Sequence, residues 1–177
     1  MSFGCWTLGA GQCRHASEGG GGPVWAVAVA PDGTRGFSGH FDGTLRVWDL
    51  DTGRCVRAAI GHTGPVYSVT VSADGHLLLS GSADGRVGVW DPASGRCLEM
   101  LKGGGRGLWP VLAGPDGRLA LTGGPDGRLR VWELGSGSRT QHVLPGHEHL
   151  ADAVALSPDG RLALSAAGTP TYECGTR

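Results

Sequence analysis

One pattern returns along this chain at a fixed interval of 42 residues, and it limits the folds that the chain can adopt. The segments FSGHFDGTLRVWD (37–49), LSGSADGRVGVWD (79–91) and LTGGPDGRLRVWE (121–133) lie in register at this spacing. Three turn segments, APDGT, SADGH and GPDGR, share the interval, and a fourth, SPDGR, follows after 43 residues. A unit that repeats in this way buries its apolar face only by stacking on its neighbours.

Each unit has the pattern of four short β-strands. The segment VWAVAVAPDGT (24–34) fits a strand that runs into a type I turn, which a glycine with positive φ closes. FDGT (41–44) is an Asp-Gly hairpin turn, and Leu45 and Val47 alternate with Arg46 and Trp48 in the strand that follows. No segment has a convincing helical period. The sequence therefore predicts an all-β, β-propeller-like array of four-stranded antiparallel blades with a 42-residue period.

The register extends to both ends of the chain and sets the predicted blade boundaries. Trp6 aligns with Trp48 and Cys13 with Cys55, so residue 1 falls in the second half of a blade. Beyond Ala167 the register fails. The predicted units are the C-terminal half of a blade at 1–18, complete blades at 19–60, 61–102 and 103–145, the N-terminal half of a blade at 146–167, and a divergent tail at 168–177.

Recurring dipeptides connect this pattern to a known family. The residues concerned are Trp48-Asp49, Trp90-Asp91, the variant Trp132-Glu133, Gly61-His62 and Gly146-His147. Together with the two Asp-Gly turns of each unit, they resemble the WD-repeat β-propeller family over about residues 3–167. The resemblance implies a ring of blades, commonly about seven. Here the two half-blades either combine and close a small ring, or leave an open arc with exposed sheet edges. A second copy of the chain would then complete the ring as a homo-oligomer.

The resemblance also implies a polar network in each blade, made of histidine, serine or threonine, aspartate and tryptophan. A buried indole N–H can only donate, and leaving it unpaired costs roughly 1–3 kcal/mol, so a nearby hydroxyl stabilises the blade. Serine, histidine and aspartate can also form a hydrolytic triad, but a triad is needed once and would not be copied every 42 residues. We therefore predict no catalytic residue.

The predicted structural network comprises His62, Ser80, Asp84 and Trp90, then Ser38, Asp42 and Trp48, and finally Thr122, Asp126 and Trp132. In the first and third complete blades, Gly20 and Gly104 stand where the histidine would be. The blade at 61–102 is therefore expected to be the best braced.

Aromatic residues recur at the start of each first strand, and two geometries are open to them. If the strand is regular, Trp25 shares a face with Val27 and Val29 and belongs to the core. If a β-bulge follows Val24, the three valines point inward and Trp25 turns out to the rim of one propeller face, which the resemblance favours. The residues before the turn aspartates would reach the same rim. The predicted partner-binding residues are Trp25, Tyr67, Trp109, Phe41 and Pro125.

Composition and the remaining motifs exclude several classes of ligand. The net charge of −1 gives no reason to expect nucleic acid or an anionic membrane surface. The segment HVLPGHEHL (142–150) holds residue types that bind zinc, but His147 already belongs to a repeated Gly-His pair, so we predict no metal and no cofactor. Cys13, Cys55 and Cys97 recur at one place and are predicted to be small packing residues, not a disulfide framework.

These observations favour a cytoplasmic, non-catalytic scaffold that binds a protein or peptide through the propeller rim. The N-terminal segment lacks the pattern of a signal peptide, and no apolar run is long enough to span a bilayer. The alternative is a fragment of a larger protein whose repeats sense or regulate an attached catalytic domain. An enzyme that uses the central channel is a third hypothesis, which no isolated group of residues supports.

Overall fold

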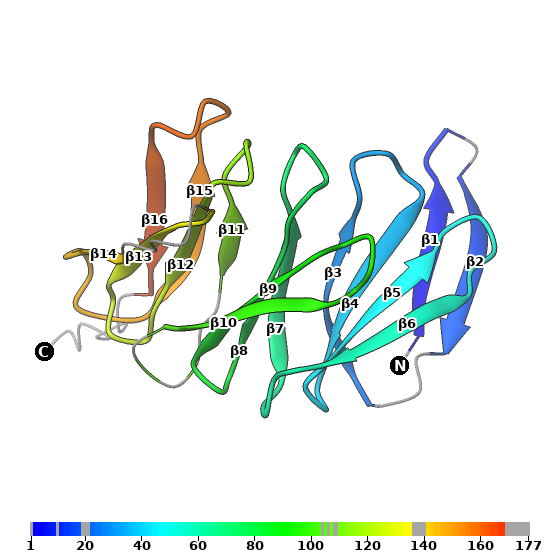
Figure 1. The fold of residues 1–177 in the computed structure, drawn as a ribbon, viewed down its shortest axis with the longest axis horizontal. Helices are drawn as coiled ribbons and strands as arrows, with labels where there is room; N and C mark the ends of the chain where they lie inside the picture. The colour runs from blue at the N-terminus through cyan, green and yellow to red at the C-terminus, as the bar shows by residue number, and fades with distance from the viewer. Residues whose placement is uncertain are drawn as a thin grey trace, which may run out of the picture.

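The computed structural model describes residues 2–9, 11–18, 22–103, 105, 107, 110–135 and 141–168, and every regular element in these ranges is a β-strand (Figure 1). The N-terminal two-stranded sheet contains β1 (Ser2–Thr7) and β2 (Gln12–Glu18), and the C-terminal one contains β15 (Ala151–Leu156) and β16 (Ala163–Ala167). Between them lie three four-stranded sheets. Their strands are β3 (Val24–Val29), β4 (Arg35–His40), β5 (Thr44–Asp49) and β6 (Cys55–Ile60), then β7 (Val66–Val71), β8 (Leu78–Ser82), β9 (Arg86–Trp90) and β10 (Cys97–Lys102), and finally β11 (Val111–Ala113), β12 (Leu119–Gly123), β13 (Leu129–Glu133) and β14 (Gln141–Leu144).

Each four-stranded sheet is one blade, in which consecutive strands pair antiparallel. We call them blade 1 (β3–β6), blade 2 (β7–β10) and blade 3 (β11–β14), and we call β1–β2 and β15–β16 the N-terminal and C-terminal half-blades. The predicted all-β array of four-stranded antiparallel blades, repeating every 42 residues, is confirmed.

Aspartate-glycine turns explain why the strands of a blade reverse where they do. Between β4 and β5, the Oδ1 atom of Asp42 accepts the backbone N–H of Thr44 at 3.0 Å, and Gly43 has a φ of +82°. The same arrangement recurs between β8 and β9, where Asp84 Oδ1 accepts the N–H of Arg86 at 2.9 Å. A carboxylate that binds its own turn, followed by a residue free to take positive φ, fixes a tight reversal.

The hydrophobic core lies between neighbouring blades. Phe37 and Val47 of blade 1 pack against Val66, Val69 and Trp90 of blade 2 in one cluster. A second cluster joins blades 2 and 3, and a third joins blade 3 to the C-terminal half-blade. Since full burial of a large apolar side chain contributes roughly 1.5–3 kcal/mol, each blade depends on its neighbours for stability.

The blades form an open arc, with the two half-blades at opposite ends of its long axis (Figure 1). The first strands of successive units, β3, β7, β11 and β15, contact one another in order along the arc. Among the described strands, β1 pairs only with β2 and β16 only with β15. The two halves therefore do not combine within this structure, and of the two arrangements expected from the sequence the open arc is the one observed.

The recurrent cysteines correct one sequence-based expectation. Cys13, Cys55 and Cys97 are exposed free thiols and do not pack in a core. Cys55 and Cys97 begin β6 and β10, the outermost strands of their blades, which have a neighbouring strand on one side only.

The described residues contain no helix with the length and apolar character needed to cross a membrane.

Substitution of Gly43 tests how strongly the β4–β5 turn depends on contact with the next blade. A Cβ at Gly43 would lie 2.7 Å from the carbonyl oxygen of His62, in the loop before β7. We expect Gly43→Ala to lower the free energy of unfolding by about 2–4 kcal/mol in urea titrations, because it adds this clash to the strain of positive φ. Gly33→Ala is the matched control, since Gly33 has a φ of +70° but no atom within 4 Å of the added carbon. Equal losses in the two variants would contradict a role for the contact between blades.

Candidate functional site

The polar residues of blade 2 form one directed chain of hydrogen bonds. The indole N–H of Trp90 donates to Ser80 Oγ at 2.8 Å, Ser80 Oγ lies 2.7 Å from His62 Nε2, and His62 Nδ1 lies 3.0 Å from Asp84 Oδ2. An ionised carboxylate only accepts hydrogen bonds. His62 therefore donates from Nδ1 to Asp84 and accepts the Ser80 hydroxyl proton at Nε2, which leaves Ser80 Oγ free to accept the indole proton.

Burial distinguishes a structural role for this chain of hydrogen bonds from a hydrolytic one. Ser80 and Trp90 are fully buried, and His62 is nearly so. A nucleophilic serine must reach a substrate, whereas Ser80 Oγ lies in the interior and is engaged by both Trp90 and His62. The geometry thus has the residue types of a triad without an accessible nucleophile.

Asp84 connects the network to two backbone segments. Its Oδ2 atom accepts the N–H of Thr63 in the loop before β7, and its Oδ1 atom accepts the N–H of Arg86 in the β8–β9 turn. Burial raises the pKa of Asp84, but the Thr63 N–H and the His62 ring outweigh it and hold that pKa below 3.8. Burial lowers the pKa of His62 below 6.5, although Asp84 opposes the shift. The pair therefore consists of a neutral imidazole and a carboxylate at neutral pH.

Blade 1 supplies its imidazole from a position that the sequence comparison missed. Trp48 donates to Ser38 Oγ at 2.7 Å, as the 42-residue repeat predicts. Ser38 Oγ also lies 2.8 Å from Nε2 of the buried His40. His40 stands two residues after Ser38 on β4, so both side chains share one face of the strand. Asp42 instead accepts the N–H and hydroxyl of Thr44. One sequence signal could have predicted this role for His40: the equivalent positions in the other two blades hold Ser82 and Gly124.

Blade 3 departs further from the expected network. Asp126 receives two hydrogen bonds from the guanidinium of Arg130, at 2.9 and 2.6 Å. The buried Thr122 Oγ1 has no hydrogen-bond partner among the described residues, so the expected link from Trp132 to Thr122 is not formed. Without a histidine to orient the hydroxyl, the aspartate of this blade pairs with arginine.

A β-bulge falls at the two aromatic positions that the structure describes. The pairing of β3 with β4 shifts between Val24 and Ala26, and that of β7 with β8 shifts between Val66 and Ser68, so Trp25 and Tyr67 are the extra residues. The Trp25 side chain is 55% exposed, and its ring contacts that of Tyr67 edge to face with centroids 5.6 Å apart. Trp25 thus follows the bulged alternative.

Two more predicted rim residues are also exposed. The N–H of Phe41 donates to the carbonyl of Pro23 at 2.9 Å, which places this exposed side chain beside the start of β3. Pro125 is exposed in the turn between β12 and β13. Trp109 lies outside the described residues.

The valines that follow the bulge in β3 do not point into a core as expected. Val27 is 61% exposed and Val29 is similarly open, whereas the equivalent Val69 of β7 is 9% exposed. Val69 packs against blade 1, whereas in the described part of the chain the face of β3 that carries Val27 lies opposite the N-terminal half-blade, across a cavity. The missing burial therefore reflects the position of β3 at the end of the complete blades.

The histidine-rich segment near residue 147 serves the same type of network. His147 Nε2 lies 2.9 Å from Ser165 Oγ, in the C-terminal half-blade. In the part of the chain that the structure describes, no three potential metal ligands lie together.

Comparison with protein families agrees with the repeats and the fold. The model described as "WD domain, G-beta repeat" matches residues 11–49, 53–91 and 111–133, which is more than half of the chain. A comparison with curated proteins gives no match.

Removal of the Asp84 carboxylate tests the blade 2 network. We expect Asp84→Ala to lower the free energy of unfolding by about 1–3 kcal/mol, because His62 and two backbone N–H groups lose their acceptor. Asp32→Ala is the control, because exposed Asp32 also binds its own turn, through Thr34, but has no histidine partner; it should lower the free energy of unfolding by less than Asp84→Ala does. An Asp84→Ala unfolding curve that superimposes on the wild type would contradict the role of the network.

The lowered pKa of His62 predicts a pH dependence of stability. In the unfolded chain the imidazole takes up a proton near pH 6.5, whereas burial keeps it neutral in the folded state. Stability conferred by neutral His62 is therefore complete above pH 6.5 and declines as the pH falls toward the lower folded pKa. His62→Gln should flatten the pH dependence of the unfolding free energy between pH 7 and about pH 5. The buried His40, whose pKa is also lowered by burial, leaves a residual slope of the same sign.

The control for this experiment is His76→Gln, in the exposed turn between β7 and β8. It should retain the wild-type slope. A wild-type slope in His62→Gln would show that this imidazole does not resist protonation in the folded blade.

Proposed function

Because this chain belongs to the WD-repeat family, whose repeats generally mediate protein–protein interactions, we propose that it is a non-catalytic scaffold that binds a protein or peptide. The binding surface in this proposal is the rim surface, defined by Trp25, Tyr67, Phe41 and Pro125, to which the sequence register adds Trp109.

The observation that carries this proposal is the aromatic pair at the two β-bulges, in which Trp25 is exposed and Tyr67 is half-buried. Trp25 and Tyr67 come from adjacent blades and meet edge to face, and the Phe41 N–H binds the carbonyl of Pro23, just before β3. A bulge redirects a side chain that would otherwise lie in the alternation of the strand. Exposed aromatic clusters are uncommon on surfaces without a binding role, and such rings contribute strongly at interfaces.

The character of the chain supports a protein or peptide as the ligand. With a net charge of −1, it lacks the electrostatic attraction that nucleic acid or an anionic membrane requires. The absence of catalysis in this proposal rests on the burial of Ser80 and His62. No observation in the described residues favours the alternative, a sensor of an attached catalytic domain. The exposed free thiols of Cys13, Cys55 and Cys97 fit a reducing compartment, so we place the protein in the cytoplasm.

Selection from a displayed random-peptide library tests the rim surface. Peptides that bind the immobilised chain are synthesised, and their affinities are measured by fluorescence polarisation. We expect the triple variant Trp25→Ala, Tyr67→Ala, Trp109→Ala to weaken binding by about thirtyfold or more, since a single aromatic anchor often contributes about 2 kcal/mol. Circular dichroism and the melting temperature should remain close to those of the wild type.

The matched control removes exposed apolar side chains away from the rim surface. Val56→Ala with Leu98→Ala alters exposed positions on the outer strands β6 and β10 and should leave peptide affinity unchanged. Unchanged binding by the triple variant would contradict the proposal. Collapse of its fold would show instead that the rings belong to the core.

A further inference from the structure

Each half-blade holds the part of the polar network that the other lacks. In the repeat register, β15–β16 correspond to the first two strands of a blade and β1–β2 to the last two. The C-terminal half-blade contains the His147–Ser165 contact of 2.9 Å, which matches the His62–Ser80 contact of 2.7 Å in blade 2. The tryptophan at the equivalent place in the N-terminal half-blade is Trp6, which is 61% exposed.

The indole nitrogen of Trp6 has the same position over its own strand as that of Trp90 in blade 2. A Cβ built at Gly4, two residues earlier, would lie 2.7 Å from Trp6 Nε1. A Cβ at the equivalent Gly88 would likewise collide with Trp90 Nε1, and also with Ser80 Oγ. The indole nitrogen of Trp6 thus lies over Gly4, as that of Trp90 lies over Gly88 next to Ser80.

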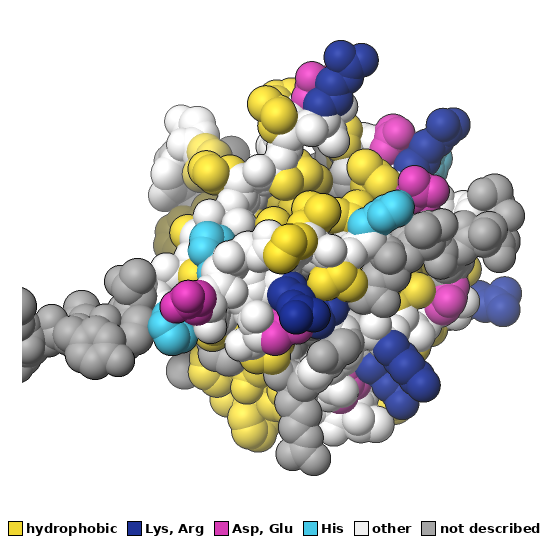
Figure 2. Space-filling model, turned by 90° about the vertical axis from the view of Figure 1, so that its left-hand side faces the viewer, with side chains coloured by type: hydrophobic (Ala, Val, Ile, Leu, Met, Phe, Trp, Pro, Cys, Tyr) yellow, Lys and Arg dark blue, Asp and Glu magenta, His cyan; other side chains and the backbone are white. Residues whose placement is uncertain are grey.

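Apolar side chains complete the match between the two ends of the arc. Leu164 is 73% exposed on β16, whereas the equivalent Leu79 of β8 is fully buried against the next blade. Figure 2 shows this end of the molecule, where apolar side chains gather over the middle of the face. At the other end Val27 and Val29 are exposed, although their equivalents in β7 pack against the preceding blade.

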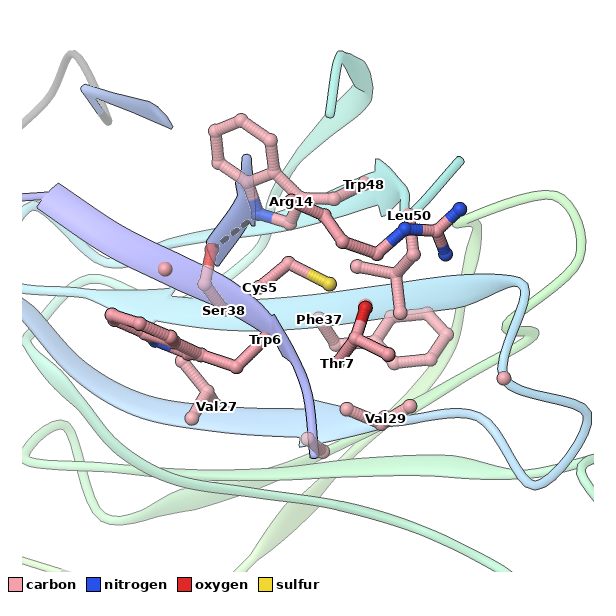
Figure 3. Close-up of a pocket in the computed structure, with 14 residues that line it drawn as sticks. Cys5, Trp6, Thr7, Arg14, Val27, Val29, Phe37, Ser38, Trp48 and Leu50 are labelled. Atoms are coloured by element: carbon pink, nitrogen blue, oxygen red, sulfur yellow. Dashed lines mark hydrogen bonds between the residues drawn. The ribbon is translucent and has the colours of Figure 1, made fainter. Parts of the chain in front are cut away.

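The N-terminal end is also hollow. A cavity of about 530 Å³ opens between β1 and blade 1, and Trp6, Val27 and Val29 help to line it. Figure 3 shows Trp6 beside Val27, with Thr7 near Val29. Among the described strands, the N-terminal half-blade lacks the two inner strands that cover this face in the complete blades.

Among the described residues, the cluster between blade 3 and the C-terminal half-blade contains no indole, unlike its counterparts. Trp90 and Trp132 belong to the two other interblade clusters. In this third cluster Val131 is only half-buried, whereas the equivalent Val47 and Val89 are buried. A tryptophan in the place of Trp6 would cover this position.

We propose that two copies of this chain associate head to tail, so that the C-terminal half-blade of each copy and the N-terminal half-blade of the other form one composite blade. β16 pairs with β1 of the second copy, the indole N–H of Trp6 donates to Ser165 Oγ, and Leu164 and Ala155 cover Val27 and Val29. The described part of each copy holds three complete blades, and together with the two composite blades these make a ring of eight. This assembly does not depend on the rim surface.

A second copy fits the geometry better than closure within one chain. Closure of a single chain would give four blades and a turn of about 90° at each, against about 45° in a ring of eight. The half-blades lie at opposite ends of the long axis of the arc, away from each other (Figure 1). The contacts required between copies repeat those that already join blades 1, 2 and 3.

Light scattering of the full chain and a designed disulfide test this assembly. The expected mass is about 36 kDa, twice the 18.1 kDa of the chain. In complete blades the equivalents of Leu164 and Cys5 are directly opposed, as Phe37 is to Val47 and Leu79 to Val89. Directly opposed Cα atoms lie about 4.5–5.5 Å apart, a separation that a disulfide spans. Leu164→Cys should therefore give a covalent dimer on mild oxidation.

Matched variants distinguish the outcomes. Leu164→Cys with Cys5→Ala should lose the covalent dimer, which excludes linkage through the other exposed thiols. A monomer without crosslink, a crosslink within one chain, or a ladder of larger species would each overturn the two-copy ring. Trp6→Phe and Ser165→Ala should each weaken dimerisation by about fivefold, and together by little more than either alone, because they remove one hydrogen bond. Additive losses would overturn the proposed Trp6–Ser165 contact.

Discussion

The buried indole N–H is the constraint around which blades 1 and 2 are arranged, because it can donate but not accept. In blade 2 the acceptor of the indole proton is Ser80 Oγ. The Ser80 hydroxyl then donates to His62, and His62 donates to Asp84. The chain of bonds ends on backbone N–H groups in two loops, so one side-chain requirement fixes the position of both. In blade 1 the acceptor is again a serine, Ser38, but the imidazole beside it is His40 of the same strand. The serine acceptor is thus the shared feature, and the histidine can come from either of two positions.

The stacking of blades on one another is the second constraint. It decides whether a given position of the repeat is buried or exposed. Val69 is buried because blade 1 covers it, while the equivalent Val27 is exposed because no described inner strand lies on its other side. Leu79 and Leu164 show the same contrast at the opposite end of the arc. The two ends of a repeat array thus expose the two complementary faces that meet and are buried between interior units.

The sequence predicted the features that depend on local chemistry and period. The four strands of each blade, the Asp-Gly turns and the order of the units follow from residues close together in the chain. The role of His40 and the Asp126–Arg130 pair did not follow, since both depend on which side chain reaches a neighbour across a strand or turn. The position of Trp25 depends on how β3 pairs with β4, because a shift of one residue moves a side chain to the other face.

The two kinds of exposed apolar surface therefore differ in origin and in the ligand they fit. The surfaces at the two ends of the arc have counterparts within the same chain. Leu164 and Ser165 at one end correspond to Leu79 and Ser80, which meet the equivalents of Val27 and Trp6 in the interior blades. The rim surface arises differently, because bulges turn Trp25 and Tyr67 out of the alternation of their strands and bring the two rings together. A surface that matches another part of the chain is suited to self-assembly, and one that lies outside the repeated contacts between blades is suited to a foreign partner. On this basis the two ends of the arc would join the copies into a ring, and the rim surface would bind the partner.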